Sequence, residues 1–186
     1  MLRQGGSAVD AAIAAQLVLA LVEPQSSGLG GGAFMVLWDK AARKIVTLDG
    51  RETAPAAATP ARFLKDGKPL AFRDAVVGGL SVGVPGTPRL IGEAHRRFGK
   101  LPWARLFEPA IRLAEDGFTV SPRLNGLLTR ETALRADPRA RTLYYDESGA
   151  PRPVGYLLKN RALARTLKPL AEKGAGAFYE GPLAAD

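Results

Sequence analysis

The sequence predicts a mixed α/β fold in which helices pack against an antiparallel hairpin, with a helical region in the C-terminal half. One observation is the order of elements near the start: an apolar helical segment, a glycine run, and two apolar runs separated by a short polar turn. Another is that neither run alternates apolar with polar residues, which is typical of strands buried on both faces. We therefore expect layers on either side of the hairpin.

The first helix is predicted over residues 7–22. Ser7 suits the N-cap position, and Asp10 three residues later completes a pattern like a capping box. Pro24 ends the helix. Apolar side chains line one face at Val9, Ile13, Leu17 and Leu21 and the opposite face at Ala11, Ala14, Val18 and Val22. A helix that is apolar all round is expected to be buried on both sides.

The runs AFMVLWD and KIVTLD predict strands at residues 33–39 and 44–49, joined by KAAR. The glycine run at 28–32 lies between the first helix and the first strand. A nucleotide-binding glycine loop follows a strand and opens a helix, which is the reverse order. We interpret the run as a tight connection that needs positive φ angles and close backbone approach.

The rest of the chain is predicted to be mainly helical. After a turn at KDGKP, helices are expected at residues 87–98, 103–107, 109–116, 122–135 and 160–173. Prolines near several helix starts, and Gly99 and Gly117 after two helix ends, follow the usual preferences at helix termini. Residues 141–158 are expected to form a turn-rich, partly extended excursion.

Composition excludes several classes of site. There are no cysteines, so disulfides, thiolate metal sites and cysteine nucleophiles are excluded. The net charge is +8, but acidic residues are interspersed with the basic ones, and we expect no nucleic-acid binding. His95 is the single histidine and lies among basic residues, so we interpret it as a surface or boundary residue and expect no metal and no cofactor. The apolar stretch at 11–22 is too short to cross a membrane.

Arg51, in LDGRETAP, follows the second predicted strand. A guanidinium there is either paired with a neighbouring carboxylate, for which Asp49 and Glu52 are candidates, or available to bind an anionic substrate. The residues alone leave both interpretations open. No serine stands in a GxSxG context, and no spacing marks Glu52 or Glu115 as part of a catalytic pair, so no catalytic residue is predicted in this chain.

Several segments resemble the γ-glutamyltranspeptidase (glutathione hydrolase) family along the whole chain: VEPQSSGLGGG, LDGRETAP, GGLSVGVPGTPRL, GKLPWARLFEPAIRLAEDGFTVSP and GAGAFYEG. The resemblance implies part of a four-layer αββα N-terminal-nucleophile hydrolase sandwich. It also implies a zymogen that cleaves itself into large and small subunits, with the small subunit's N-terminal threonine as nucleophile. That enzyme cleaves γ-glutamyl amides such as glutathione and transfers the γ-glutamyl group to water, amino acids or peptides.

Carried over to this chain, the resemblance makes Arg51 the contact for the α-carboxylate of the γ-glutamyl donor. A planar guanidinium donates two parallel hydrogen bonds to a carboxylate, which a lysine does not. Asp49 and Glu52 are possible orienting residues. Residues 1–186 correspond to a single partial domain, the front half of a large subunit. We therefore expect the chain to be inactive alone, to pair with the small subunit of the same precursor, and to self-associate when isolated.

Other members of this superfamily share these motifs, so two enzymatic alternatives stay open: a cephalosporin or glutaryl acylase, and a poly-γ-glutamate-processing enzyme. A non-catalytic, glutamate-binding remnant is a third. Bacterial members of the family are expected to be periplasmic or secreted, but the first ten residues have no signal-peptide pattern and look like the interior of a longer protein.

Overall fold

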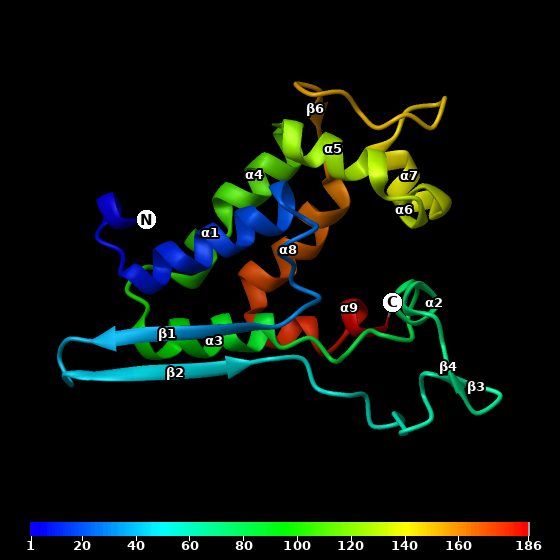
Figure 1. Ribbon diagram of the computed structural model, residues 1–186. Coiled ribbons are helices and arrows are strands. Elements are labelled where there is room, and N and C mark those ends of the chain that lie inside the picture. Colours follow the sequence, from blue (N-terminus) through cyan, green and yellow to red (C-terminus); the bar gives the residue numbers. More distant parts are fainter. Residues whose placement is uncertain (186) are drawn as a thin grey trace.

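The computed structural model describes residues 1–185 (Figure 1). Helices are η1 (Leu2–Gln4), α1 (Ala8–Val22), α2 (Phe72–Val76), α3 (Thr87–Phe98), η2 (Trp103–Leu106), α4 (Glu108–Asp116), α5 (Pro122–Arg130), α6 (Ala133–Ala136), α7 (Pro138–Tyr144), α8 (Arg161–Lys173), η3 (Ala175–Phe178) and α9 (Pro182–Ala185). Strands are β1 (Ala33–Asp39), β2 (Lys44–Gly50), β3 (Leu64–Lys65), β4 (Lys68–Pro69), β5 (Phe118–Thr119) and β6 (Leu157–Leu158). Each strand pairs antiparallel with one other: β1 with β2, β3 with β4, and β5 with β6.

The β1–β2 hairpin has the predicted position and a continuous register from Ala33 opposite Gly50 to Asp39 opposite Lys44. Helix α3 lies along one face of it (Figure 1). Met35, Leu37 and Leu48 pack on that side against the main core. The hairpin therefore has a covered face, and its β2 strand ends beside the first turn of α3.

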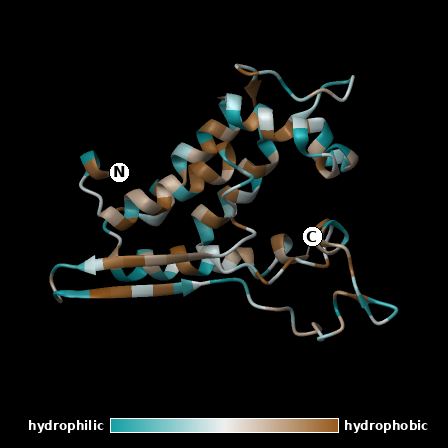
Figure 2. Ribbon diagram, in the orientation of Figure 1, coloured by the Kyte–Doolittle hydropathy of each residue, from teal (hydrophilic) through white to brown (hydrophobic). Residues whose placement is uncertain are grey.

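Helices α1, α4 and α8 pack together above the hairpin and form the body of the chain (Figure 1). Figure 2 shows hydrophobic residues gathered where these helices face one another. The larger cluster includes the fully buried Ile13, Leu17 and Leu167 and extends to α3 and the hairpin. A second cluster lies around Leu124, Tyr145 and the β5–β6 pair.

Local sequence signals are confirmed at several helix ends. The Ser7 hydroxyl accepts a hydrogen bond from the backbone N–H of Asp10 at 3.1 Å, and the Asp10 carboxylate accepts one from the N–H of Ser7 at 2.7 Å. Gly99 and Gly117 are the C-caps of α3 and α4. The mixed helix-and-strand class predicted from the sequence is confirmed.

Two boundary predictions are wrong. The helix expected at 122–135 ends at Arg130, because Glu131 leaves the helical conformation and its side chain accepts a hydrogen bond from the N–H of Ala133 at 2.9 Å. The excursion expected at 141–158 begins within α7. The Asp137 side chain caps that helix by accepting hydrogen bonds from the N–H groups of Arg139 and Ala140.

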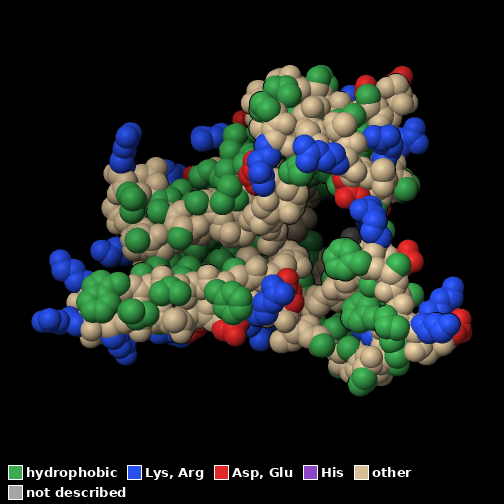
Figure 3. Space-filling model, in the orientation of Figure 1, with side chains coloured by type: hydrophobic (Ala, Val, Ile, Leu, Met, Phe, Trp, Pro, Cys, Tyr) green, Lys and Arg blue, Asp and Glu red, His purple; other side chains and the backbone are tan. Residues whose placement is uncertain are grey.

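Two expectations about the hairpin region also need correction. The second face of the hairpin is not covered by residues 1–185: Phe34, Val36, Trp38 and Ile45 are exposed there. Figure 3 shows hydrophobic side chains in a row over this strand pair. The run at 28–32 contains no glycine with positive φ. Close backbone approach is confirmed at Gly32, where an added Cβ would overlap the side chain and backbone of Glu52.

Candidate substrate-binding site

Arg51 follows directly after β2. Asp49 and Glu52, the two carboxylates proposed as its partners, each contact a different part of it. The backbone N–H of Arg51 donates a 2.9 Å hydrogen bond to Asp49 Oδ1. The guanidinium Nη1 lies 3.2 Å from Glu52 Oε2. Asp49 therefore fixes the main chain at the strand end, whereas Glu52 contacts the charged group.

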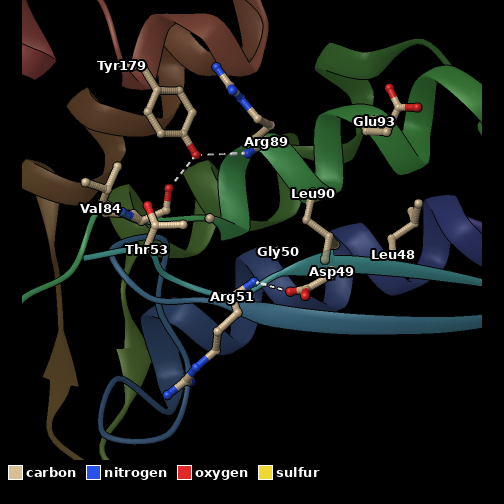
Figure 4. A pocket seen from close by; sticks show the side chains of 12 residues that line it. Leu48, Asp49, Gly50, Arg51, Thr53, Val84, Arg89, Leu90, Glu93 and Tyr179 are labelled. Atoms are coloured by element: carbon tan, nitrogen blue, oxygen red, sulfur yellow. Dashed lines mark hydrogen bonds between the residues drawn. The ribbon is translucent and has the colours of Figure 1, made fainter. Parts of the chain in front are cut away.

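The Arg51 side chain is 67% exposed, although that of Glu52 is only 26% exposed. Glu52 Oε2 is buried and has no hydrogen-bond partner among residues 1–185, so its contact with Arg51 is an ion pair without a well-directed hydrogen bond. In Figure 4 the guanidinium of Arg51 extends away from Arg89 and Tyr179. The carboxylate holds one edge of the guanidinium and leaves most of it accessible.

Three glycines let other backbone segments approach the residues around Arg51. A Cβ at Gly86 would overlap the carbonyl oxygen of Gly50, and a Cβ at Gly83 would lie 2.9 Å from Glu52 Cβ. Gly32 contacts Glu52 from the opposite segment. Because no side chain fits at these contacts, the strand end is held directly by backbone from residues 31–32 and 83–86.

Backbone hydrogen bonds join the same segments. Thr53 and Val84 form an isolated antiparallel bridge with N···O distances of 3.3 and 2.8 Å. The carbonyl oxygen of Gly31 accepts hydrogen bonds from the N–H groups of Gly86 and Thr87 and from the Thr87 hydroxyl, all at 3.0–3.1 Å. The glycine run thus contributes a backbone anchor for the start of α3.

Arg51 lies between two cavities, each of about 420 Å³. The first is bounded by the end of β2, by residues 84–86 and by the start of α3, with Tyr179 above it (Figure 4). The second lies between residues 51–63 and 80–83. Their size is within the range of small-molecule pockets. Arg51 and Thr53 line both cavities, and Asp49, Arg89 and Glu93 also line the first.

Sequence reasoning missed Tyr179 and the segment 83–86 as parts of this site. Both lie in segments that carry the family resemblance, GAGAFYEG and GGLSVGVPGTPRL, but nothing in their local pattern predicts contact across more than 90 residues. The Tyr179 hydroxyl donates to the carbonyl of Pro85 at 2.8 Å. Tyr179 and Pro85 meet only through the tertiary fold, which the local sequence does not reveal.

The other candidate residues lie elsewhere. His95 is partly buried, with Nε2 2.8 Å from the carbonyl of Leu101, and its ring packs against Trp103. The boundary interpretation of His95 is confirmed. Glu115 forms an ion pair with Lys168 on the surface. Within the described residues there is no cluster of His, Asp or Glu that could hold a metal ion, and no helix has the length and apolar character needed to cross a membrane.

Fold and site together define a mixed α/β protein that presents an arginine at the end of a hairpin. A family profile described as Gamma-glutamyltranspeptidase matches residues 1–186. The chain belongs to this family.

Among curated proteins, the chain is 45% identical to Scoloptoxin SSD14 from Scolopendra dehaani in an alignment of 188 positions, which covers 100% of this chain and 32% of that protein. It is 41% identical to Glutathione hydrolase 3 from Arabidopsis thaliana, covering 97% of this chain and 28% of that protein. The chain therefore spans about a third of the length of these relatives.

The chain is also similar to solved structures, one of them a γ-glutamyltranspeptidase. The Helicobacter pylori γ-glutamyltranspeptidase matches with a TM-score of 0.91 and 32% identity, over 99% of this chain and 53% of that chain. A cephalosporin acylase from Bacillus halodurans matches with a TM-score of 0.79 and 33% identity, over 99% and 35%. The N-terminal-nucleophile hydrolase fold expected from the resemblance is confirmed, and the acylase shares it at the level of the superfamily.

Proposed function

We propose that the complete protein cleaves γ-glutamyl amides such as glutathione and transfers the γ-glutamyl group to water or to an amino acid or peptide. The observation that carries this proposal is the exposed guanidinium of Arg51 in a chain that matches the γ-glutamyltranspeptidase family from end to end. The nucleophile is expected from a small subunit cut from the same precursor. Two further relatives support this by their names, the glutathione hydrolase proenzyme of Bacillus subtilis and the glutathione hydrolase 5 proenzyme of Homo sapiens.

In this proposal Arg51 binds the α-carboxylate of the donor, and Glu52 orients the guanidinium through the 3.2 Å ion pair. Five N–H donors on a planar fork allow one edge to contact Glu52 while another edge holds the substrate. Asp49 fixes the backbone through its hydrogen bond to the N–H of Arg51. The carboxylate would be bound similarly in ground and transition states, so Arg51 contributes mainly to donor affinity.

The test is an assay of the complete protein on three substrates: a γ-glutamyl anilide, the same anilide with its α-carboxylate amidated, and a cephalosporin side-chain amide. We expect turnover of the first, much weaker turnover of the second, and little of the third. Preference for the cephalosporin amide would instead establish the acylase alternative. Absence of turnover on all three, in protein that has been processed into two subunits, would contradict the proposed function.

A further inference from the structure

The side chain of Tyr179 connects the C-terminal part of the chain to the start of α3. Its hydroxyl donates a hydrogen bond to the carbonyl of Pro85 at 2.8 Å and accepts one from the N–H of Arg89 at 3.2 Å. Both contacts are drawn in Figure 4. The guanidinium of Arg89 lies over the Tyr179 ring, 5.2 Å from its centroid.

Arg89 is the third residue of α3, so its N–H has no partner within the helix. The N-cap of α3 is Gly86, which has no side chain to supply a capping hydrogen bond. The N–H of Thr87 is bonded to the carbonyl of Gly31 instead. Tyr179 therefore acts as a remote cap for the remaining donor of this first turn.

The Tyr179 hydroxyl also holds residues 83–86, the segment that packs against the backbone on either side of Arg51. Pro85 lies between Val84, which pairs with Thr53, and Gly86, which abuts Gly50. Arg51 lies between Gly50 and Thr53 in the sequence. A shift of the Pro85 carbonyl would therefore move both contacts that set the path of the main chain at Arg51.

We propose that Tyr179 is a positioning residue for substrate binding, because its hydroxyl holds residues 83–86 against the strand end that carries Arg51. This inference rests on the proposed function, in which Arg51 binds the donor carboxylate. Both hydrogen bonds of the Tyr179 hydroxyl are to backbone groups of this chain. Tyr179 acts through Pro85 and the bridge between Val84 and Thr53.

Tyr179→Phe removes only the hydroxyl and keeps the ring beneath Arg89, so it tests the two hydrogen bonds separately from packing. In the complete protein we expect the donor KM to rise about three- to tenfold, as for loss of a modest net hydrogen-bond contribution, with kcat nearly unchanged. In an Arg51→Ala background the same substitution should have almost no further effect on kcat/KM, because coupled residues are not additive.

Tyr145→Phe is the matched control. The Tyr145 hydroxyl also donates to backbone carbonyls, those of Leu128 and Glu131, but in the second hydrophobic cluster. This variant should lower the thermal midpoint and leave the donor KM unchanged. An equal rise of KM in both Tyr→Phe variants would show a general loss of structure and would overturn the positioning role.

Amide hydrogen exchange gives a readout that does not depend on activity. Tyr179→Phe should accelerate exchange in residues 51–54 and 83–87, where the bridge and the start of α3 lie, but not in the central turns of α8. Unchanged exchange at the bridge would overturn the inference whether or not the protein hydrolyses γ-glutamyl amides. Accelerated exchange in a protein without this activity would instead contradict only the proposed function.

Discussion

The guanidinium of Arg51 lies 3.2 Å from a carboxylate oxygen of Glu52 that is itself buried. The arginine side chain is far more exposed than its partner. The pair therefore combines an inner edge that faces Glu52 with an outer edge that is accessible to solvent. It also means that the two interpretations open from the sequence, ion pair or substrate contact, are compatible.

The first prediction concerns Arg51 in the complete protein. Arg51→Lys keeps the charge but loses the bidentate fork, and Arg51→Ala loses both. A hydrogen bond to a charged group is worth roughly 1.5–3 kcal/mol, and each ~1.4 kcal/mol is tenfold in affinity. The donor KM should thus rise about ten- to a hundredfold for the lysine variant and further for the alanine variant. Steady-state kinetics on a γ-glutamyl anilide measure this.

The effect of Arg51 should disappear for a donor whose α-carboxylate is amidated, because that substrate offers no anion. This substrate is the control for the arginine series. Equal donor KM values for the wild-type protein and Arg51→Ala, in folded and processed protein, would leave Arg51 with a structural role only.

The second prediction concerns Glu52. Glu52→Gln has nearly the same shape but lacks the charge that holds Nη1 of Arg51. We expect the donor KM to rise by less than in Arg51→Lys, because the guanidinium remains but is less well oriented. Thermal unfolding should change little, since the substitution removes a largely buried charge rather than creating one. A large loss of thermal stability with unchanged KM would mean that Glu52 serves folding instead of orientation.

The third prediction concerns the open face of the hairpin. The isolated chain of residues 1–186 should bind a hydrophobic dye and self-associate, because Phe34, Val36, Trp38 and Ile45 are exposed together on β1 and β2. Val36→Lys with Ile45→Lys should reduce both effects. Leu19→Lys, which replaces an exposed apolar residue on α1, should have much less influence. A monodisperse wild-type chain without dye fluorescence would contradict this expectation.

The fourth prediction is a pH dependence at Asp10, which is fully buried. Burial acts to raise the pKa of this carboxyl, but hydrogen bonds from the backbone N–H groups of Ser7, Lys100 and Leu101 outweigh it and lower the pKa below its usual value. A lowered folded-state pKa gives stability that is present above about pH 4 and is lost as the pH falls through the folded pKa.

Asp10→Asn should therefore lower the thermal midpoint of the complete protein at neutral pH, and the difference from wild type should shrink in acid. Differential scanning calorimetry at pH 7 and at successively lower values measures it. A difference that stays constant with pH would show that the loss comes from packing rather than from charge.

Elements whose signals are local could be predicted from the sequence. The start of α1 follows from Ser7 and Asp10, and the hairpin from two apolar runs around a polar turn. The break at Glu131 could not be predicted, because the carbonyl of Glu131 accepts a hydrogen bond from Tyr145 and its side chain pairs with Arg73. Both partners are distant in the sequence.

In the candidate site too, some features follow from the local sequence and others depend on distant segments. A strand end followed by Arg51, with carboxylates on both sides, is visible in eight consecutive residues. The contacts from Gly86 and Tyr179 depend on how distant segments meet, which no local pattern states. The continuous apolar pattern of the hairpin indicates a cover on both faces, but among residues 1–185 only the face toward α3 is covered.

The contact between Gly86 and the carbonyl of Gly50 has a consequence for engineering. At this contact the backbone of residues 50 and 86 meets directly, so the contact itself contains no side chain that could be trimmed or enlarged to move the arginine by small steps. Altered substrate preference should therefore be sought at side chains that line the two cavities, such as Thr53 and Phe63. In a directed-evolution library, the glycines at 50 and 86 are positions to hold constant.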